Sequence, residues 1–291
     1  MKADNIFYYW CLVCVVSLAL SFFTVISFIV GHGLPTINGA LFVGDTDFIR
    51  GILGLSPIWD GIWPACVGTL MVVFSALLLA IIPGLASGIW LAQAKPSGFK
   101  HIVSLVIDII AGIPSILMGL FGFSLILLLR HWLLPSANVC LFLSALSLAI
   151  LIIPYLAASV KTALLALPAS LLLTALSLGM SYRQALIKVL IPQASKGIMS
   201  GIMLATGRAA EDTAVIMLTG VVVNAGLPIS IFERYEALPF TIFYYSAQYQ
   251  NEAELQLAFG AALVLLCLTA SLFAFASLLQ SRYQGMTSDS Y

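Results

Sequence analysis

Residues 207–220 read GRAAEDTAVIMLTG and place three ionisable side chains, Arg208, Glu211 and Asp212, between two apolar runs. The run before them is GIMSGIMLAT and the run after them is AVIMLTGVVV. Together these runs are long enough to cross a bilayer, which takes about 20 apolar residues in a helix. Charged side chains are costly inside such a segment unless they face other protein groups or water. This stretch therefore bears on both the fold and the function.

The composition of the whole chain indicates that its solvent is lipid. Of its 291 residues, 62% are hydrophobic and 8% are charged, whereas a soluble domain carries about 25% charged residues. The formal net charge is zero, so we expect no nucleic-acid partner. The three histidines are not spaced as metal ligands, and no G-x-x-x-x-G-K-[ST] run occurs. We therefore expect no metal and no cofactor in this chain, and no ATP binding through that motif.

Several long apolar segments predict an all-α integral membrane protein with six transmembrane helices. The predicted spans are residues 7–30, 65–92, 102–129, 139–163, 198–223 and 255–280. Prolines 83, 114 and 154 lie inside these spans, where membrane bundles tolerate kinks because neighbouring helices satisfy the freed backbone groups. We divide the chain into an N-terminal anchor helix with an outer loop, residues 1–64, and a core of five spans, residues 65–291.

The distribution of positive charge predicts the orientation of the spans, because Lys and Arg favour the cytoplasmic side. The segments that include both termini hold eight basic residues: Lys2, Lys95, Lys100, Lys161, Arg183, Lys188, Lys196 and Arg282. The opposite segments hold three: Arg50, Arg130 and Arg234. Both termini are therefore predicted to be cytoplasmic, as an even number of spans requires. On the other side, the aromatic-rich residues 231–250 predict an interfacial helix or hairpin.

The longest cytoplasmic segment, residues 164–197, is apolar rather than polar: LLALPASLLLTALSLGMSYRQALIKVLIPQASKG. Pro168 favours the start of a helix, and Gly179 favours its end in a left-handed conformation. Ser181 is typical of the N-cap of a second helix, which Pro192 is expected to break. A short apolar helix facing the cytoplasm requires a covering surface. A partner protein, the protein's own bundle and the membrane interface all remain open on these grounds.

This segment resembles the cytoplasmic signature of permease subunits of ABC importers, which has the form E-A-A-x-x-x-G, nine residues, I-x-x-P. The matching residues are Leu173, Thr174, Ala175, Gly179, Val189 and Pro192. Leu173 stands where that family has glutamate, and Val189 stands where it has isoleucine. The resemblance implies the type I ABC importer permease fold, with a coupling helix that docks on an ATPase subunit. It also implies that ATP is used by that partner and that this chain is a transport subunit rather than an enzyme.

Three further stretches are similar to the phosphate permeases of this family, of the PstA type. They are AGIPSILMGLFG (111–122), ATGRAAEDTAVIMLTG (205–220) and ALPFTIFYYSAQYQNEAELQLAFGAALVLL (237–266). In the family's R-A-x-G-E-T-A-P run, the arginine matches Arg208 and the glutamate matches Asp212. Glu211 takes the place of the glycine. This resemblance implies a bacterial inner-membrane importer of inorganic phosphate, in which this chain is the permease.

The partners implied by the resemblance are a second, related but different permease chain, two nucleotide-binding subunits and a periplasmic or lipid-anchored phosphate-binding protein. Within such an assembly, Arg208, Glu211 and Asp212 would line the translocation path. Arg208 would meet the phosphate oxygens, since its guanidinium suits that anion, and Asp212 would hold Arg208 in place. Glu211 would be either protonated or paired with the second permease.

Other interpretations of the same residues stay open on the sequence. The charged cluster could serve only to lock helices together, as in a structural membrane subunit. The substrate could be another oxyanion, such as sulfate or molybdate. The chain could also be a proton-coupled secondary carrier, with Asp108, Glu211 and Asp212 as a proton relay.

Overall fold

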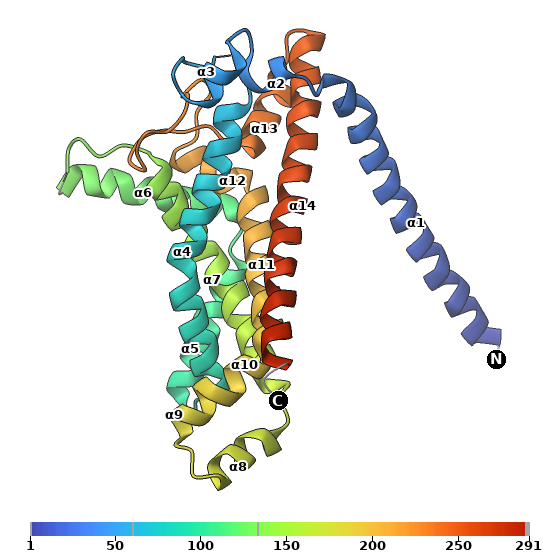
Figure 1. The fold of residues 1–291 in the computed structure, drawn as a ribbon, viewed down its shortest axis with the longest axis vertical. Helices are drawn as coiled ribbons and strands as arrows, with labels where there is room; N and C mark the ends of the chain where they lie inside the picture. The colour runs from blue at the N-terminus through green and yellow to red at the C-terminus, as the bar shows by residue number, and fades with distance from the viewer. Residues whose placement is uncertain (1, 60, 133, 289–291) are drawn as a thin grey trace.

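The computed structural model describes residues 2–59, 61–132 and 134–288, which form helices joined by loops (Figure 1). Four of the six predicted spans are confirmed as continuous helices. These helices are α1 (Lys2–Gly33), α4 (Trp63–Gln93), α7 (Leu141–Leu165) and α14 (Glu252–Ser288). Pro83 and Pro154 lie inside α4 and α7, as predicted. The side chains of Lys2 and Arg282, which contributed to the predicted orientation, lie outside the described residues.

The third predicted span is two helices rather than one. Helix α5 (Gly98–Gly112) ends at Ile113, whose backbone is extended, and α6 (Ser115–Trp132) begins after Pro114. The expectation that Pro114 kinks a continuous helix is wrong, because the ring of a proline disfavours helical conformation in the residue before it. As a result, α6 turns away from the direction of α5 and projects from the side of the bundle (Figure 1).

The fifth predicted span is also divided. Helix α11 (Ser195–Glu211) stops one residue before Asp212, and α12 (Thr213–Thr219) starts one residue after it. Asp212 itself has an extended backbone, with φ −76° and ψ 104°. Irregular backbone at membrane depth is tolerated where it is buried in protein or lines a water-filled path.

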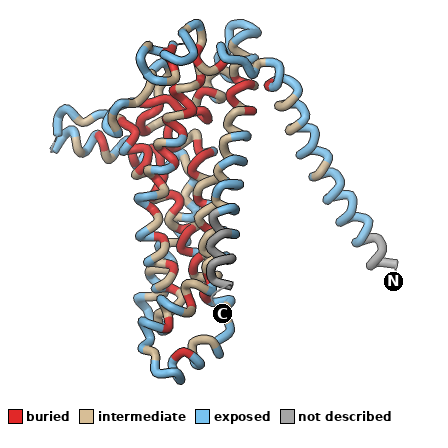
Figure 2. Tube along the Cα trace, viewed as in Figure 1, coloured by how far each residue is buried: buried red, intermediate tan, exposed pale blue. Residues whose placement is uncertain are grey.

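The core of the bundle lies along α7, which packs against α4 and α11. Leu148, Ile152 and Leu156 of α7 are fully buried there. Figure 2 shows the buried residues concentrated along the bundle axis, whereas α1 is exposed along most of its length. Helix α1 leans away from the bundle and contacts α14 near its own C-terminal end, where Phe28 packs edge to face on Phe259.

Short helices and loops cover the upper end of the bundle in Figure 1, opposite α8. They include α2 (Gly39–Val43), α3 (Phe48–Ile52) and α13 (Leu238–Gln248). Helix α13 confirms the helix predicted in residues 231–250. The loop before it is fixed to the bundle, because the Leu238 N–H donates to Thr69 Oγ1 of α4 at 2.9 Å and the Leu141 N–H of α7 donates to the Glu233 carbonyl at 2.9 Å.

The lower end of the bundle carries α8 (Ala169–Ser177), α9 (Tyr182–Ala185), a π-helical turn (Leu186–Leu190) and α10 (Ile191–Gln193). Gly179 has φ +82°, which confirms the predicted left-handed residue after α8. Ser181 and Gln184 form a capping box at the start of α9, as predicted for Ser181.

The predicted break at Pro192 is wrong, because helical structure continues through it as α10. The wider π turn just before the proline gives its ring room that a regular helical turn would not. A turn at Ala194, whose backbone is still right-handed, divides α10 from α11.

Candidate functional site

The charged cluster lies at the junction of α11 and α12. Arg208 and Glu211 belong to the last turn of α11, and Asp212 forms the link. The Asp212 Oδ1 atom accepts a hydrogen bond from the Val215 N–H at 2.9 Å and so caps the first turn of α12. An aspartate in this position satisfies one of the backbone N–H groups that a helix start leaves without an intrahelical partner. The capping preference of Asp was therefore the sequence signal for the break.

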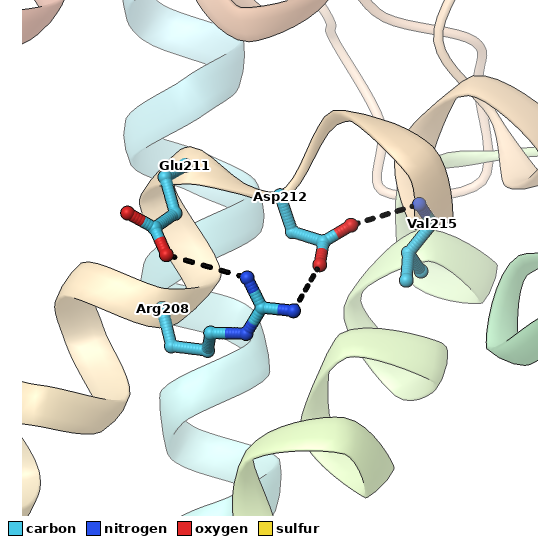
Figure 3. Close-up of polar contacts among 4 residues, drawn as sticks. All are labelled: Arg208, Glu211, Asp212 and Val215. Carbon is cyan, nitrogen blue, oxygen red and sulfur yellow. Dashed lines mark hydrogen bonds and ion pairs between the residues drawn. The ribbon is translucent and has the colours of Figure 1, made fainter. Parts of the chain in front are cut away.

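Arg208 bonds to both acids (Figure 3). Its Nη1 atom lies 3.3 Å from Glu211 Oε1, and its Nη2 atom lies 3.2 Å from Asp212 Oδ2. The contact of Asp212 with Arg208 agrees with the expectation that Asp212 holds Arg208 in place, whereas the contact of Glu211 with Arg208 was not predicted. The two carboxylates use different nitrogens of one guanidinium, so neither needs to leave for the other to bind.

The three side chains differ in burial. Asp212 is 2% exposed, Arg208 is 30% exposed and Glu211 is 66% exposed. The cluster is therefore not a sealed contact between helices. It extends from the packed interior, at Asp212, to the surface of this chain, at Glu211.

An exposed stripe on α11 leads from its first turn to the cluster. Lys196, Ser200 and Leu204 are exposed at intervals of four residues, and Arg208 follows at the same interval. At about 100° per residue these positions and Glu211 fall within an arc of about 120°. Lys196 was predicted only to favour the cytoplasmic side, and Ser200 and Leu204 were not among the predicted site residues. The i,i+4 spacing back from Arg208 was the available signal.

The residues that match the coupling signature lie within α8 and after it. Leu173 is 64% exposed and Thr174 is exposed, whereas Ala175 is buried. Beyond the helix, Leu178 is 75% exposed beside Gly179. Leu171 and Leu172 of the same helix pack against the bundle. Helix α8 thus has one face on its own protein and another apolar face left uncovered, and Pro192 lies apart from that uncovered face, in α10.

A second ionisable group that the sequence analysis did not single out is Glu236, in the loop before α13. Its carboxylate accepts the Gly226 N–H at 2.9 Å, and burial raises the pKa of Glu236 to about 7. Asp108, the third acid of the alternative proton relay, lies within α5, and its side chain is exposed. Over residues 2–59, 61–132 and 134–288, no cluster of three or more His, Cys, Asp or Glu side chains could hold a metal ion.

Comparison with known proteins places these features in a family. The family described as binding-protein-dependent transport system inner membrane component matches residues 84–285. The chain is 29% identical over 254 residues to the probable phosphate transport system permease protein PstA of Methanocaldococcus jannaschii, across 87% of this chain and 85% of that protein. It is 30% identical over 242 residues to the phosphate transport system permease protein PstC of Pasteurella multocida, across 72% and 74% of the two chains.

Among solved structures, the fold is similar to the inward-facing MetNI methionine ABC transporter. The TM-score is 0.61 at 19% sequence identity, and the match covers 82% of this chain and 99% of that chain. The predicted type I importer permease fold is therefore confirmed.

Proposed function

The chain belongs to the family of binding-protein-dependent transport system inner membrane components, and on that premise we propose that it is the permease subunit of an ATP-driven importer of inorganic phosphate. It is a multi-pass membrane protein and a subunit of an ABC importer, a class that combines permease, ATPase and binding-protein components. The permeases named above, which are 29% and 30% identical to this chain, support phosphate as the substrate.

The observation that carries the proposal is the exposure of charged side chains partway along a bundle of apolar helices. Glu211 is 66% exposed on the surface of this chain. It is the last residue of α11, which is one of the helices of the apolar bundle. A charged group facing hydrocarbon costs on the order of 3 kcal/mol even on the most lenient scale. Glu211 and Arg208 must therefore face water or another protein. A hydrated path between this chain and a second permease chain satisfies both requirements.

Within that path, the roles of Arg208 and Asp212 follow from their positions. Arg208 offers a planar, permanently charged donor to passing phosphate oxygens. Asp212 fixes the guanidinium from the buried side. The stripe of Lys196, Ser200 and Leu204 continues from Arg208 toward the α8 end of the bundle. Conduction requires that each contact be weak enough to release the anion, and a guanidinium already shared with carboxylates meets that requirement.

Coupling to ATP hydrolysis is assigned to α8 and the residues after it. The uncovered face of Leu173, Thr174 and Leu178 would dock on the nucleotide-binding subunit, while Ala175 and Gly179 shape the helix end and Pro192 directs the chain back into α11. On this proposal, α8, the two ends of the chain and the two ATPase subunits would lie in the cytoplasm of a bacterial cell. The phosphate-binding protein would then dock on the side of α2, α3 and α13.

The test is uptake of radiolabelled phosphate into proteoliposomes that contain the purified importer, its binding protein and enclosed ATP. Arg208→Met should abolish uptake while the complex assembles normally, and Arg208→Lys should retain part of it. Unlabelled phosphate should compete, and equimolar sulfate should not. Wild-type uptake by Arg208→Met, or equal competition by sulfate, would contradict the proposal.

The coupling assignment has its own test. Leu173→Ser and Leu178→Ser together should reduce co-purification of the ATPase subunit, because they remove exposed apolar contact area without touching the core. A matched control, Leu53→Ser, removes a leucine that is 66% exposed at the opposite end of the bundle. Equal recovery of the ATPase with both variants would refute the docking role of this face.

A further inference from the structure

The carboxylates of Asp212 and Glu211 both bond to the guanidinium of Arg208. The Asp212 side chain is buried, whereas the Glu211 side chain is exposed, so the two contacts differ in strength. We propose that Glu211 is an exchangeable counter-ion of Arg208, which occupies the Nη1 side while the path is empty and yields it to an arriving oxyanion. The inference deepens the proposed function and rests on it. It assigns to Glu211 a role in setting how tightly the path holds its substrate.

Asp212 is the fixed half of the cluster. It is 2% exposed, and its two oxygens are engaged in different directions: Oδ1 with the Val215 N–H and Oδ2 with Arg208 Nη2. Moving this carboxylate would uncap α12 and leave a buried charge without its partner, which is strongly unfavourable. Asp212 therefore keeps Arg208 in position whatever occupies the other side of the guanidinium.

Glu211 is the exchangeable half. Its contact with Arg208 is a 3.3 Å hydrogen bond on the exposed side, and its side chain is 66% exposed. Exposed ion pairs at i,i+3 contribute little to stability because water solvates both groups and the side chain loses rotamer freedom. Rotation of the Glu211 side chain would free Nη1 without disturbing α11, α12 or the Asp212 contact. An oxyanion in the path can then take the place of Glu211 on Nη1.

The displaced Glu211 carboxylate also affects release of the bound anion from Arg208. Glu211 stays tethered within reach of Nη1, so it competes for the guanidinium as long as the anion is bound and repels the anion electrostatically. Both effects weaken binding and speed departure. In the phosphate-permease run R-A-x-G-E, glycine stands at the position of Glu211. This chain therefore carries a competing carboxylate that the run itself does not include.

The experiment measures binding of radiolabelled inorganic phosphate to the purified complex of this chain with its partner permease and ATPase subunits, without binding protein and without ATP. Glu211→Gln keeps the shape of the side chain and removes its charge. Its Kd for phosphate should be at least about tenfold lower than that of the wild type, because juxtaposed like charges cost more than that factor. The difference should shrink in high salt, since the site is hydrated.

The transport rate gives a second measurement. A purely structural role of Glu211 would not change this rate in the direction expected here. In proteoliposomes, Glu211→Gln should turn over more slowly than the wild type and should be inhibited more strongly by phosphate on the cytoplasmic side. Arg208→Met should abolish phosphate binding in both the wild-type and the Glu211→Gln background.

The matched control is Asp47→Asn, which removes the same charge from another i,i+3 pair. Asp47 lies 3.9 Å from Arg50 in the exposed α3 region, far along the chain from the cluster. Asp47→Asn should leave the Kd unchanged. A Kd for Glu211→Gln equal to that of the wild type, or an equal decrease in Asp47→Asn, would overturn the inference. If the wild-type complex transports no phosphate at all, the proposed function itself fails, so the two failures are distinguishable.

Discussion

Asp212 offers the sharpest test of the site, because one side chain performs two separable tasks. It caps α12 through the Val215 N–H and forms an ion pair with Arg208. Asn is as good an N-cap as Asp, so Asp212→Asn should lose only the ion pair. Removal of one partner from a buried ion pair costs about 3–5 kcal/mol. Arg208 remains 30% exposed and partly solvated, so we expect the lower end, about 3 kcal/mol.

Asp212→Ala should lose the cap as well and cost about 1 kcal/mol more than Asp212→Asn. The measurement is equilibrium unfolding of the purified protein in mixed micelles, read by circular dichroism. The double variant Arg208→Met with Asp212→Asn removes both charges and should recover about 2 kcal/mol relative to Asp212→Asn alone. The control Asp47→Asn, in an exposed pair with Arg50, should change stability by less than about 0.5 kcal/mol.

Three results would refute this reasoning about Asp212. One is stability of Asp212→Asn equal to that of the wild type. Another is equal stability of the Asn and Ala variants. The third is a double variant as unstable as the sum of its single changes, since this would mean that the two charges are not coupled.

Three further predictions follow from the packing and the loops. A methyl group at Gly68 of α4 would overlap the carbonyl oxygen of Glu236, so Gly68→Ala should lower stability by about 1–3 kcal/mol in thermal melts; Gly112→Ala, which meets no atom within 4 Å, should not. Gly179 has φ +82°, so Gly179→Ala should cost about 1 kcal/mol locally and speed amide hydrogen exchange at Met180, which donates to the Ala175 carbonyl at 3.2 Å. Burial raises the pKa of Glu236 from 4.5 to about 7, so the folded state binds this proton more tightly. That stabilisation is complete below pH 4.5 and is lost as the pH rises through 7. Wild-type stability should therefore fall by about 3 kcal/mol over this range, whereas Glu236→Gln should lack this slope in melts at pH 5 and pH 8.

The sequence predicted the long helices well because length and apolarity alone decide them. A run such as residues 139–163 has to satisfy its backbone groups internally in lipid, and only a helix does so within one segment. Local chemistry likewise ended α8 shortly before Gly179 and started α9 just after its N-cap Ser181, since glycine conformation and hydroxyl capping depend on adjacent residues.

The breaks in the third and fifth spans were harder to predict. Pro114 and Pro154 are both prolines in apolar runs, yet only the first ends its helix. The difference lies in the neighbours, because Pro154 is buried among the other helices and Pro114 precedes a helix that leaves the bundle. Asp212 carried a capping signal, but the spacing of the acids from Arg208 fitted a continuous helix equally well.

The sequence by itself determined that this chain is a membrane-embedded helical protein, that Arg208 lies within reach of two acids, and that a short apolar helix lies outside the long spans. These properties depend on composition and on spacing along one helix, which are local. Only the tertiary structure decided that Asp212 is buried and Glu211 is exposed. Burial depends on which neighbouring helices cover each side of α11, and no local pattern encodes that.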